Sequence, residues 1–453
     1  MMPEMIAGGE AEPSGDDGTW AQPGITDVPT ARAFLQTLAS RDTLVMPSVD
    51  GDVGYRFSRS SLRTRGLGAT IARNVIAATA PSADLARYHL SLGLEPERRY
   101  CPRGLRAGVP LAELVLSDGG LLEELRGAGR LRRMVVGFKN QAAEALIDRL
   151  GLSPAYCSPP PTAYERANDK LEFAHAAGRY GFDALGLHPV GDLHALDSMF
   201  RTMSTVYGDG CVLRLRRGAA GRHLRHARTL PAARRAWQRL NALDGVLIGP
   251  YIPRTVVRRA VAAHGIVTAD GFAPLALSEQ LLSGHRYRGS RVTHEWASEE
   301  IGAVLSSLRA IAAWLRDLGY IGAPAGIDGF LVDAPQGLRF VALDPNIRMT
   351  ATMMPWAVAS ALGRAAGRRF AWQYEASVIV GRTVTFAALE RRLGSDLLRS
   401  DRLQHGGILP SVVTPAPMFG VGISRLQAIL LARDVEHLTY LSCRSRGLGL
   451  VVR

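Results

Sequence analysis

The chain has 453 residues, 47% of them hydrophobic, which is enough for two or three domains. Its formal net charge is +13, but only two of its 54 basic residues are lysines, Lys139 and Lys170, and the arginines are dispersed. Dispersed arginine is typical of biased base composition, so the charge is weak evidence for nucleic acid, while an acidic or phosphorylated ligand stays compatible with it.

The cysteines and the N-terminus indicate the compartment. The four cysteines are far apart and form no CxxC pair or Cys/His cluster, which disfavours a zinc site and a disulfide scaffold. The N-terminus lacks the basic start and apolar core of a signal peptide, and no segment has about 18 uninterrupted apolar residues. We therefore expect a cytoplasmic protein without a membrane partner. Residues 1–29, rich in Gly, Pro, Glu and Asp, are expected to be disordered.

Residues 30–165 are predicted to form an N-terminal α/β domain. Buried strands are expected at residues 43–49 and 133–137, the second followed by a helix at residues 141–150. The three prolines of Ser158–Thr162 are expected to close this domain as a stiff linker.

Lys139 and Asn140 stand where the second of these strands passes into the helix. Ligands often bind at such a place. From spacing alone, an Asn helix cap with an exposed neighbour is the more economical interpretation.

The second unit, residues 166–370, opens with Asn168-Asp-Lys at the start of a helix expected to reach Ala177. A strand at residues 211–216 then leads into Arg217–Arg222, a turn of small residues flanked by positive charge. Backbone N–H groups of such a turn can bind phosphate oxygens. The signal is weak by itself, because Gly-containing hairpins are common.

The later part of the sequence shows alternating strand-like and helix-like patterns. They predict a strand at residues 245–252, a hairpin at 256–272, an amphipathic core helix at 299–318, a helix through Trp356 and Leu362, and, in the C-terminal α/β portion 371–453, two helices at 384–393 and 424–433.

Residues 323–353 predict two adjacent strands joined by a turn, with a metal-site pattern at their ends. Asp344 and Asn346 are two residues apart and share a strand face, and the preceding strand can place Asp328 beside them. These are hard oxygen ligands that suit Mg²⁺, with Arg348 on the same face to meet phosphate. A hairpin with solvated aspartates explains this pattern equally well.

Taken in chain order, the sequence presents a helix-opening lysine, a strand with a basic residue before a glycine loop, a short apolar strand, and the acidic hairpin. This series resembles the ATP-grasp superfamily of carboxylate-amine ligases over residues 165–365, most specifically at Asp328 and the sequence Leu343-Asp-Pro-Asn-Ile-Arg348. The resemblance implies an α/β ATP-grasp fold with an N-terminal α/β (pre-ATP-grasp) domain and a C-terminal α/β portion. It also implies ATP and Mg²⁺ as cofactors.

The resemblance assigns the nucleotide site to three segments. Lys170 matches the first phosphate-binding lysine, and Arg214 stands where the family usually has the second. The glycine loop matches the phosphate-covering loop, and Ile248–Ile252 match the adenine hinge, where Gly249 replaces a common acidic residue. The candidate cofactor-binding residues are Lys170, Arg214, Gly218, Gly221, Gly249, Pro250, Tyr251 and Ile252.

The same resemblance assigns the metal to Asp328, Asp344 and Asn346, and contact with the reacting groups to Arg348. Residues 277–289 lie where the family places the acyl substrate and its covering loop, although an ordinary polar loop is an equal alternative. The candidate catalytic residues are Arg348, Arg286 and Arg288, and the candidate substrate-binding residues are Glu279, Gln280 and Lys139.

The implied activity is ATP-dependent joining of an amino-acid-like carboxylate to the amine of an amino acid or peptide, through an acyl phosphate and with release of ADP. Alternatives are a ligase of another acid and amine, or a nucleotide-binding protein without turnover. An RNA-binding protein is a third class, but the sequence has no RNA motif and no clustered basic and aromatic face. We expect small-molecule partners and no nucleic acid. The sequence does not decide between a monomer and a homodimer.

Overall fold

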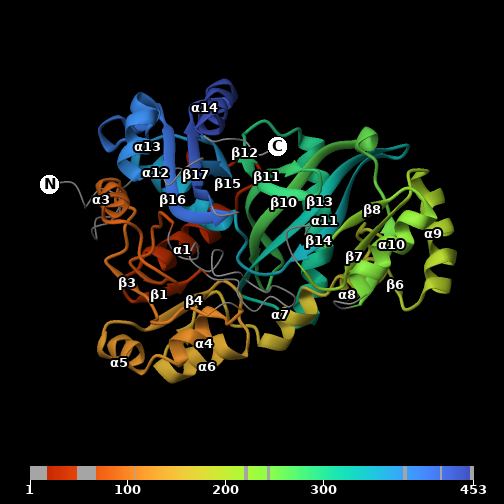
Figure 1. Ribbon diagram of the computed structural model, residues 1–453, viewed down its shortest axis with the longest axis horizontal. Coiled ribbons are helices and arrows are strands. Elements are labelled where there is room, and N and C mark those ends of the chain that lie inside the picture. Colours follow the sequence, from red (N-terminus) through yellow and green to blue (C-terminus); the bar gives the residue numbers. More distant parts are fainter. Residues whose placement is uncertain are drawn as a thin grey trace.

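The computed structural model describes residues 18–47, 68–106, 108–218, 223–241, 245–380, 385–418 and 421–448. Their strands form three sheets of five, four and eight strands. In Figure 1 the N-terminal α/β unit and the four-stranded unit lie at opposite ends, with the eight-stranded sheet between them. None of the described helices is long and apolar enough to cross a membrane.

The N-terminal unit is a parallel five-stranded sheet with helices on both faces. Alternate residues of its strands pack on opposite sides, with Leu44 and Met46 against helices α4 to α6 and Val45 against α1. In sheet order the strands are β3 (Arg98–Tyr100), β2 (Asn74–Ile76), β1 (Thr43–Met46), β4 (Arg133–Val136) and β5 (Ser153–Pro154), and the helices are α1 (Val28–Ala39), α3 (Ala83–Ser91), α4 (Leu111–Leu116), α5 (Gly119–Gly127) and α6 (Gln141–Leu150).

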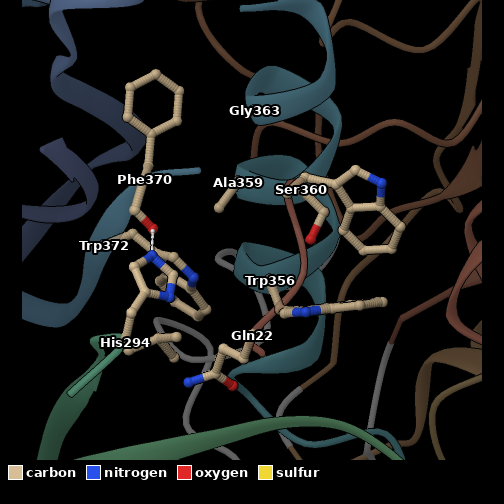
Figure 2. Close-up of a pocket in the computed structure, with 10 residues that line it drawn as sticks. Gln22, His294, Trp356, Ala359, Ser360, Gly363, Phe370 and Trp372 are labelled. Carbon is tan, nitrogen blue, oxygen red and sulfur yellow. Dashed lines mark hydrogen bonds between the residues drawn. The ribbon is translucent and has the colours of Figure 1, made fainter. Parts of the chain in front are cut away.

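The predicted disorder of residues 1–29 is wrong for residues 18–29, and residues 1–17 lie outside the described part. Trp20 and Ile25 are buried, and Gln22 bonds to both the N–H and the C=O of Leu277. Figure 2 shows Gln22 beside helix α12 (Met353–Ala365), at a pocket of ≈ 10 Å³ that admits about one water molecule. This segment is therefore core, and the pocket is too small for a substrate.

The four-stranded antiparallel sheet has the order β6-β9-β7-β8. The expected linker at 158–162 is only partly correct, because Pro161 already begins helix α7. The expected helix from Asn168 to Ala177 begins instead at Lys170, with Asp169 as its N-cap. This part contains α7 (Pro161–Ala167), α8 (Lys170–Tyr180), β6 (His188–Val190), α9 (Leu193–Tyr207), β7 (Cys211–Leu215), β8 (Arg225–Ala227), α10 (Leu230–Asn241), β9 (Val246–Pro250) and the 3₁₀ turn η1 (Arg254–Val256).

The eight-stranded sheet is antiparallel, with helix α11 on one face and α12 on the other. Strand β12 pairs with β15, so the C-terminal portion shares this sheet with the strands before it. In sheet order the strands are β14 (Gly337–Asn346), β13 (Ala323–Ala334), β10 (Val257–Val267), β11 (Phe272–Ser283), β12 (Arg286–Val292), β15 (Ala371–Val380), β17 (Val421–Ala432) and β16 (Gly407–Met418), and the remaining elements are α11 (Ser298–Asp317), α13 (Phe386–Leu393), η2 (Gly394–Asp396), η3 (Ser400–His405) and α14 (Val435–Gly447).

The helix predicted at residues 424–433 is wrong, because this segment is strand β17. Leu426, Ala428 and Leu430 pack with α13 and α14, while Ile429 and Leu431 pack with α12. A strand buried on both faces reads as a continuous apolar run, which periodicity alone does not separate from a helix.

Candidate functional site

The β13–β14 hairpin brings the candidate metal-binding side chains together. Asp328 pairs directly with Asp344 across the strands, and Gly326 pairs with Asn346. All three polar side chains therefore share one sheet face, as the hairpin pattern predicts. The Nδ2 of Asn346 donates to Oδ2 of Asp328 at 2.7 Å, so the side-chain Oδ1 of Asn346 is left for another partner.

Two cations from another part of the chain contact Asp344. Lys170, the first residue of α8, places Nζ 3.2 Å from Asp344 Oδ1 and donates to the Gly218 carbonyl at 2.6 Å. Arg214 of β7 donates to Asp344 Oδ2 and to the Leu343 carbonyl, both at 2.9 Å. The four-stranded unit and the eight-stranded sheet thus meet at this carboxylate.

The geometry gives a reason for arginine at position 214. Its guanidinium spans a carboxylate and a backbone carbonyl at once, because its N–H donors lie in a planar fork. The compact ammonium of a lysine is a single point donor and would not reproduce this arrangement.

The two aspartates have opposite electrostatic environments. Burial opposes ionisation of Asp344, but Lys170 and Arg214 outweigh burial and hold its pKa below the ordinary value. Burial, followed by the neighbouring Asp344 carboxylate, raises the pKa of Asp328 to about 7. Arg348 lowers the pKa of both aspartates, but at Asp328 it does not offset burial and the Asp344 charge, so a further cation beside Asp328 would be stabilised.

The donor set fits Mg²⁺. Asp344 Oδ1 is buried and makes no hydrogen bond of good geometry, although Lys170 is near, and Asn346 can offer its side-chain Oδ1. Within the described ranges, no group of three or more His, Cys, Asp or Glu could hold a metal. Such a sparse set suits a cation that completes its coordination with phosphate oxygens and water.

Arg348 follows β14 and is held by Asn168, for which the sequence predicted a place at a helix start but no role in the site. Asn168 Oδ1 accepts from Arg348 Nη1 at 3.2 Å and from the Ile347 N–H at 3.0 Å. On the next residue, the Met349 N–H donates to the Gly137 carbonyl at the end of β4. The N-terminal unit and its connection to α8 therefore fix the backbone around Arg348.

The expected adenine hinge, Ile248–Ile252, overlaps the end of the buried strand β9. A Cβ at Gly249 would lie 2.9 Å from the Gly186 carbonyl oxygen, which explains the glycine at this position. Tyr251 stacks on His226 with ring centroids 3.6 Å apart. Pro250 pairs with Cys211 in the sheet, and Ile252 joins an apolar cluster that includes Leu185, Leu187, Val332 and Val341.

The expected phosphate loop is described only at its start. Gly218 accepts the hydrogen bond from Lys170 and has a backbone φ of +147°, which favours glycine. Gly221 lies outside the described residues.

Glu279 and Gln280 lie on a strand rather than in a loop, so their side chains point to opposite faces of the sheet. Gln280 lies on the aspartate face and hydrogen-bonds to Asp328. Glu279 pairs with Val261 and Arg291, on the face that α11 covers. The structure therefore brings Gln280 to the site and places Glu279 away from it.

Arg286 and Arg288 lie on β12, at the hairpin that β11 and β12 form. Arg286 is exposed and Arg288 is partly exposed. They are not among the residues that contact the aspartates.

Asn140 caps α6 as expected. Lys139, the residue before this cap, was expected to be exposed, but it is buried. Lys139 is 5% exposed, with Nζ 3.4 Å from Glu144 and 3.3 Å from the Ser158 carbonyl. These contacts tie the start of α6 to the chain before α7.

Lys170→Met is expected to weaken nucleotide affinity at least tenfold and to lower the melting temperature by several degrees. The lysine is 3% exposed and contacts both the glycine loop and Asp344. Breaking a buried pair costs more than an exposed one, although Arg214 still neutralises Asp344. Titration calorimetry with MgADP measures the affinity. Lys139→Met, which removes the other buried lysine, is the control and should keep wild-type affinity.

No family model matches the sequence, and no curated protein matches it. Among solved structures, the chain is similar to the ADP complex of an N5-carboxyaminoimidazole ribonucleotide synthetase, with 11% identity and a TM-score of 0.51 over 82% of this chain and 89% of that chain. It is also similar to the biotin carboxylase domain dimer of Hydrogenobacter thermophilus 2-oxoglutarate carboxylase, in complex with MgADP, ADP and bicarbonate, with 13% identity and a TM-score of 0.52 over 88% of each chain.

A third similar structure is N5-carboxyaminoimidazole ribonucleotide synthetase from Thermus thermophilus, with 18% identity and a TM-score of 0.50 over 83% of this chain and 92% of that chain. Together these likenesses show that the chain has the α/β ATP-grasp fold, with flanking N-terminal and C-terminal α/β parts. The fold predicted from sequence is confirmed.

Proposed function

We propose that this protein is an ATP-dependent carboxylate-amine ligase that releases ADP and phosphate. The supporting observation is the convergence on Asp344 of Lys170 and Arg214, with Asp328 directly opposite on the neighbouring strand. Similar structures contain ADP or MgADP, which supports nucleotide binding by this chain as well.

The residues of this chain have distinct roles in that reaction. Asp328, Asp344 and the side-chain Oδ1 of Asn346 would hold Mg²⁺, which would neutralise phosphate charge. The substrate carboxylate attacks the γ-phosphorus and ADP leaves, while Lys170 and Arg214 offset the negative charge of the transferring group.

The second step joins the amine to the activated acid. The amine nitrogen attacks the carbonyl carbon of the acyl phosphate, loses a proton and expels phosphate. Arg348 stabilises the tetrahedral oxyanion, because its guanidinium is held beside the strand end that carries the metal-binding residues. No covalent bond to the protein is required, so no Ser or Cys nucleophile takes part.

Purified protein with ATP, Mg²⁺, an acid and an amine is expected to release ADP and phosphate in equal amounts. The acid oxygen attacks the γ-phosphorus, so the bond between the γ-phosphorus and the oxygen that bridges it to the β-phosphate breaks. Coupled assays for ADP and for pyrophosphate, across panels of acids and amines, separate the outcomes. Stoichiometric pyrophosphate would exclude this mechanism, and nucleotide binding without ADP release would favour a non-catalytic protein.

We further propose that the amine substrate is an amino acid or peptide. In sequence the whole chain, including its Asn168-Asp-Lys and Ser278-Glu-Gln segments, looks most like the peptide ligase of pheganomycin biosynthesis. That likeness supports a role in making a peptide natural product with antibiotic activity. Arg286 and Arg288 offer cations for the C-terminal carboxylate of a peptide at the β11–β12 hairpin.

A peptide with a free C-terminus is expected to have a Michaelis constant about tenfold lower than that of its C-terminal amide. A charge-assisted contact with arginine contributes about 1.5–3 kcal/mol, and amidation removes the charge. Steady-state kinetics of wild type, Arg286→Ala and Arg288→Ala test this, and at least one variant should remove the difference. If amidation has no effect on wild type, these arginines do not bind the peptide carboxylate.

A further inference from the structure

Asn168 lies between helices α7 and α8 and is 8% exposed. Its side-chain amide bonds to both backbone polar groups of one residue, Ile347. Oδ1 accepts from the Ile347 N–H at 3.0 Å, and Nδ2 donates to the Ile347 carbonyl at 3.0 Å. Ile347 follows β14, the edge strand of the eight-stranded sheet, so Asn168 acts as a one-residue strand partner for the chain that leads to Arg348.

The other donor and acceptor positions of the Asn168 side-chain amide also form hydrogen bonds. Nδ2 donates to the Tyr164 carbonyl in α7 at 2.8 Å, and Oδ1 accepts from Arg348 Nη1 at 3.2 Å. The two donors and the two acceptor positions of Asn168 are therefore all engaged, which fixes the orientation of the amide. The same oxygen that fixes the Ile347 backbone also fixes the Arg348 guanidinium.

The two residues after Asn168 each hold another part of the site. Asp169 caps α8 and accepts from Arg216 Nε at 2.6 Å, and Lys170 contacts Gly218 and Asp344. Three consecutive residues thus join α7, the start of the glycine loop and the end of β14. A displacement at Asn168 is transmitted to Arg348 directly.

We propose that Asn168 is a positioning residue for Arg348, which sets the guanidinium where the acid and the phosphate react. The catalytic part of this inference rests on the proposed ligase function. Loss of the amide frees Arg348 from one of its hydrogen-bond partners, and misplacement of a catalytic group by about 1 Å lowers rates by on the order of 10²-fold.

The test is a double-mutant cycle of wild type, Asn168→Ala, Arg348→Ala and the double variant, with kcat for ADP release and melting temperature as readouts. We expect Asn168→Ala to lower kcat by about 10- to 100-fold with the Michaelis constant for ATP changed less than threefold. In the Arg348→Ala background the same substitution should change kcat less than twofold, because no guanidinium remains to be positioned.

Asn74→Ala is the matched control. Asn74 is also a buried clamp, whose Nδ2 donates to the carbonyls of Arg41 at 2.9 Å and Thr43 at 3.3 Å, but it lies in the N-terminal sheet. It should lower the melting temperature by an amount similar to Asn168→Ala and keep wild-type kcat. A merely structural Asn168 would give the same pattern as this control, which would overturn the proposal.

The melting-temperature cycle needs no turnover and keeps the two hypotheses separate. The melting temperatures are measured in the protein without nucleotide. If the decreases caused by Asn168→Ala and Arg348→Ala do not add in the double variant, the two residues are coupled, and this supports the contact even if wild type releases no ADP. Absence of ADP release by wild type would count against the ligase function alone. Additive losses in both kcat and melting temperature would overturn the positioning role while leaving the ligase function intact.

Discussion

Asp344→Asn is expected to lower kcat by about 10³-fold or more and to destabilise the protein without ligand. Removing a metal ligand costs several kcal/mol of transition-state stabilisation, and each 1.4 kcal/mol is about a factor of ten. Stability falls because Lys170 and Arg214, both largely buried, lose their shared counter-charge. Steady-state ADP release and chemical unfolding measure the two effects.

Asp183→Asn is the matched control for this substitution. Asp183, which lies between α8 and β6, pairs through an exposed salt bridge with Arg339 of β14, the strand that carries Asp344. An exposed pair contributes about 0–1 kcal/mol, so this variant should keep wild-type turnover and nearly wild-type stability. Wild-type kcat for Asp344→Asn at saturating Mg²⁺ would show that the aspartate pair is only a polar strand face.

The parts of the site that were predictable from sequence are the local ones. Asp328 and Asp344 belong to strands joined by a tight turn, so alternation and register place them opposite each other before any tertiary contact is known. The same alternation places Glu279 and Gln280 on opposite faces of their strand. This difference was not predicted, because the segment could equally be interpreted as a loop.

Tertiary contacts supply the rest. Asn168 and Ile347 are separated by 179 positions, and no local pattern marks a buried asparagine as the partner of a distant strand end. Lys139 is buried through its contacts with Glu144 and Ser158, although a position before a helix cap suggests exposure. Gly249 likewise reflects the close approach of Gly186, which lies more than sixty residues earlier in the sequence.

Asp328→Asn is expected to abolish most turnover while making the protein without metal more stable at pH 8, by about 1–3 kcal/mol. Asp328 lies beside Asp344, and burial together with that like charge raises its pKa to about 7. An ionised carboxylate is therefore unfavourable in the folded protein, and a neutral amide of the same shape relieves the penalty while keeping an oxygen for the Asn346 donor.

The pH dependence distinguishes this relief of charge repulsion from a general stabilisation. Because the folded protein binds a proton at Asp328 more tightly than the unfolded chain, the contribution of Asp328 to wild-type stability falls as pH rises from about 4 to about 7 and then stays low. The gain in Asp328→Asn should thus be full at pH 8 and vanish near pH 4, in chemical unfolding with chelator present. Added Mg²⁺ and ADP should stabilise wild type more than the variant, because the variant lacks one of the two carboxylates. A variant that is less stable than wild type at pH 8 without metal would show that the two aspartates do not repel each other in the folded protein.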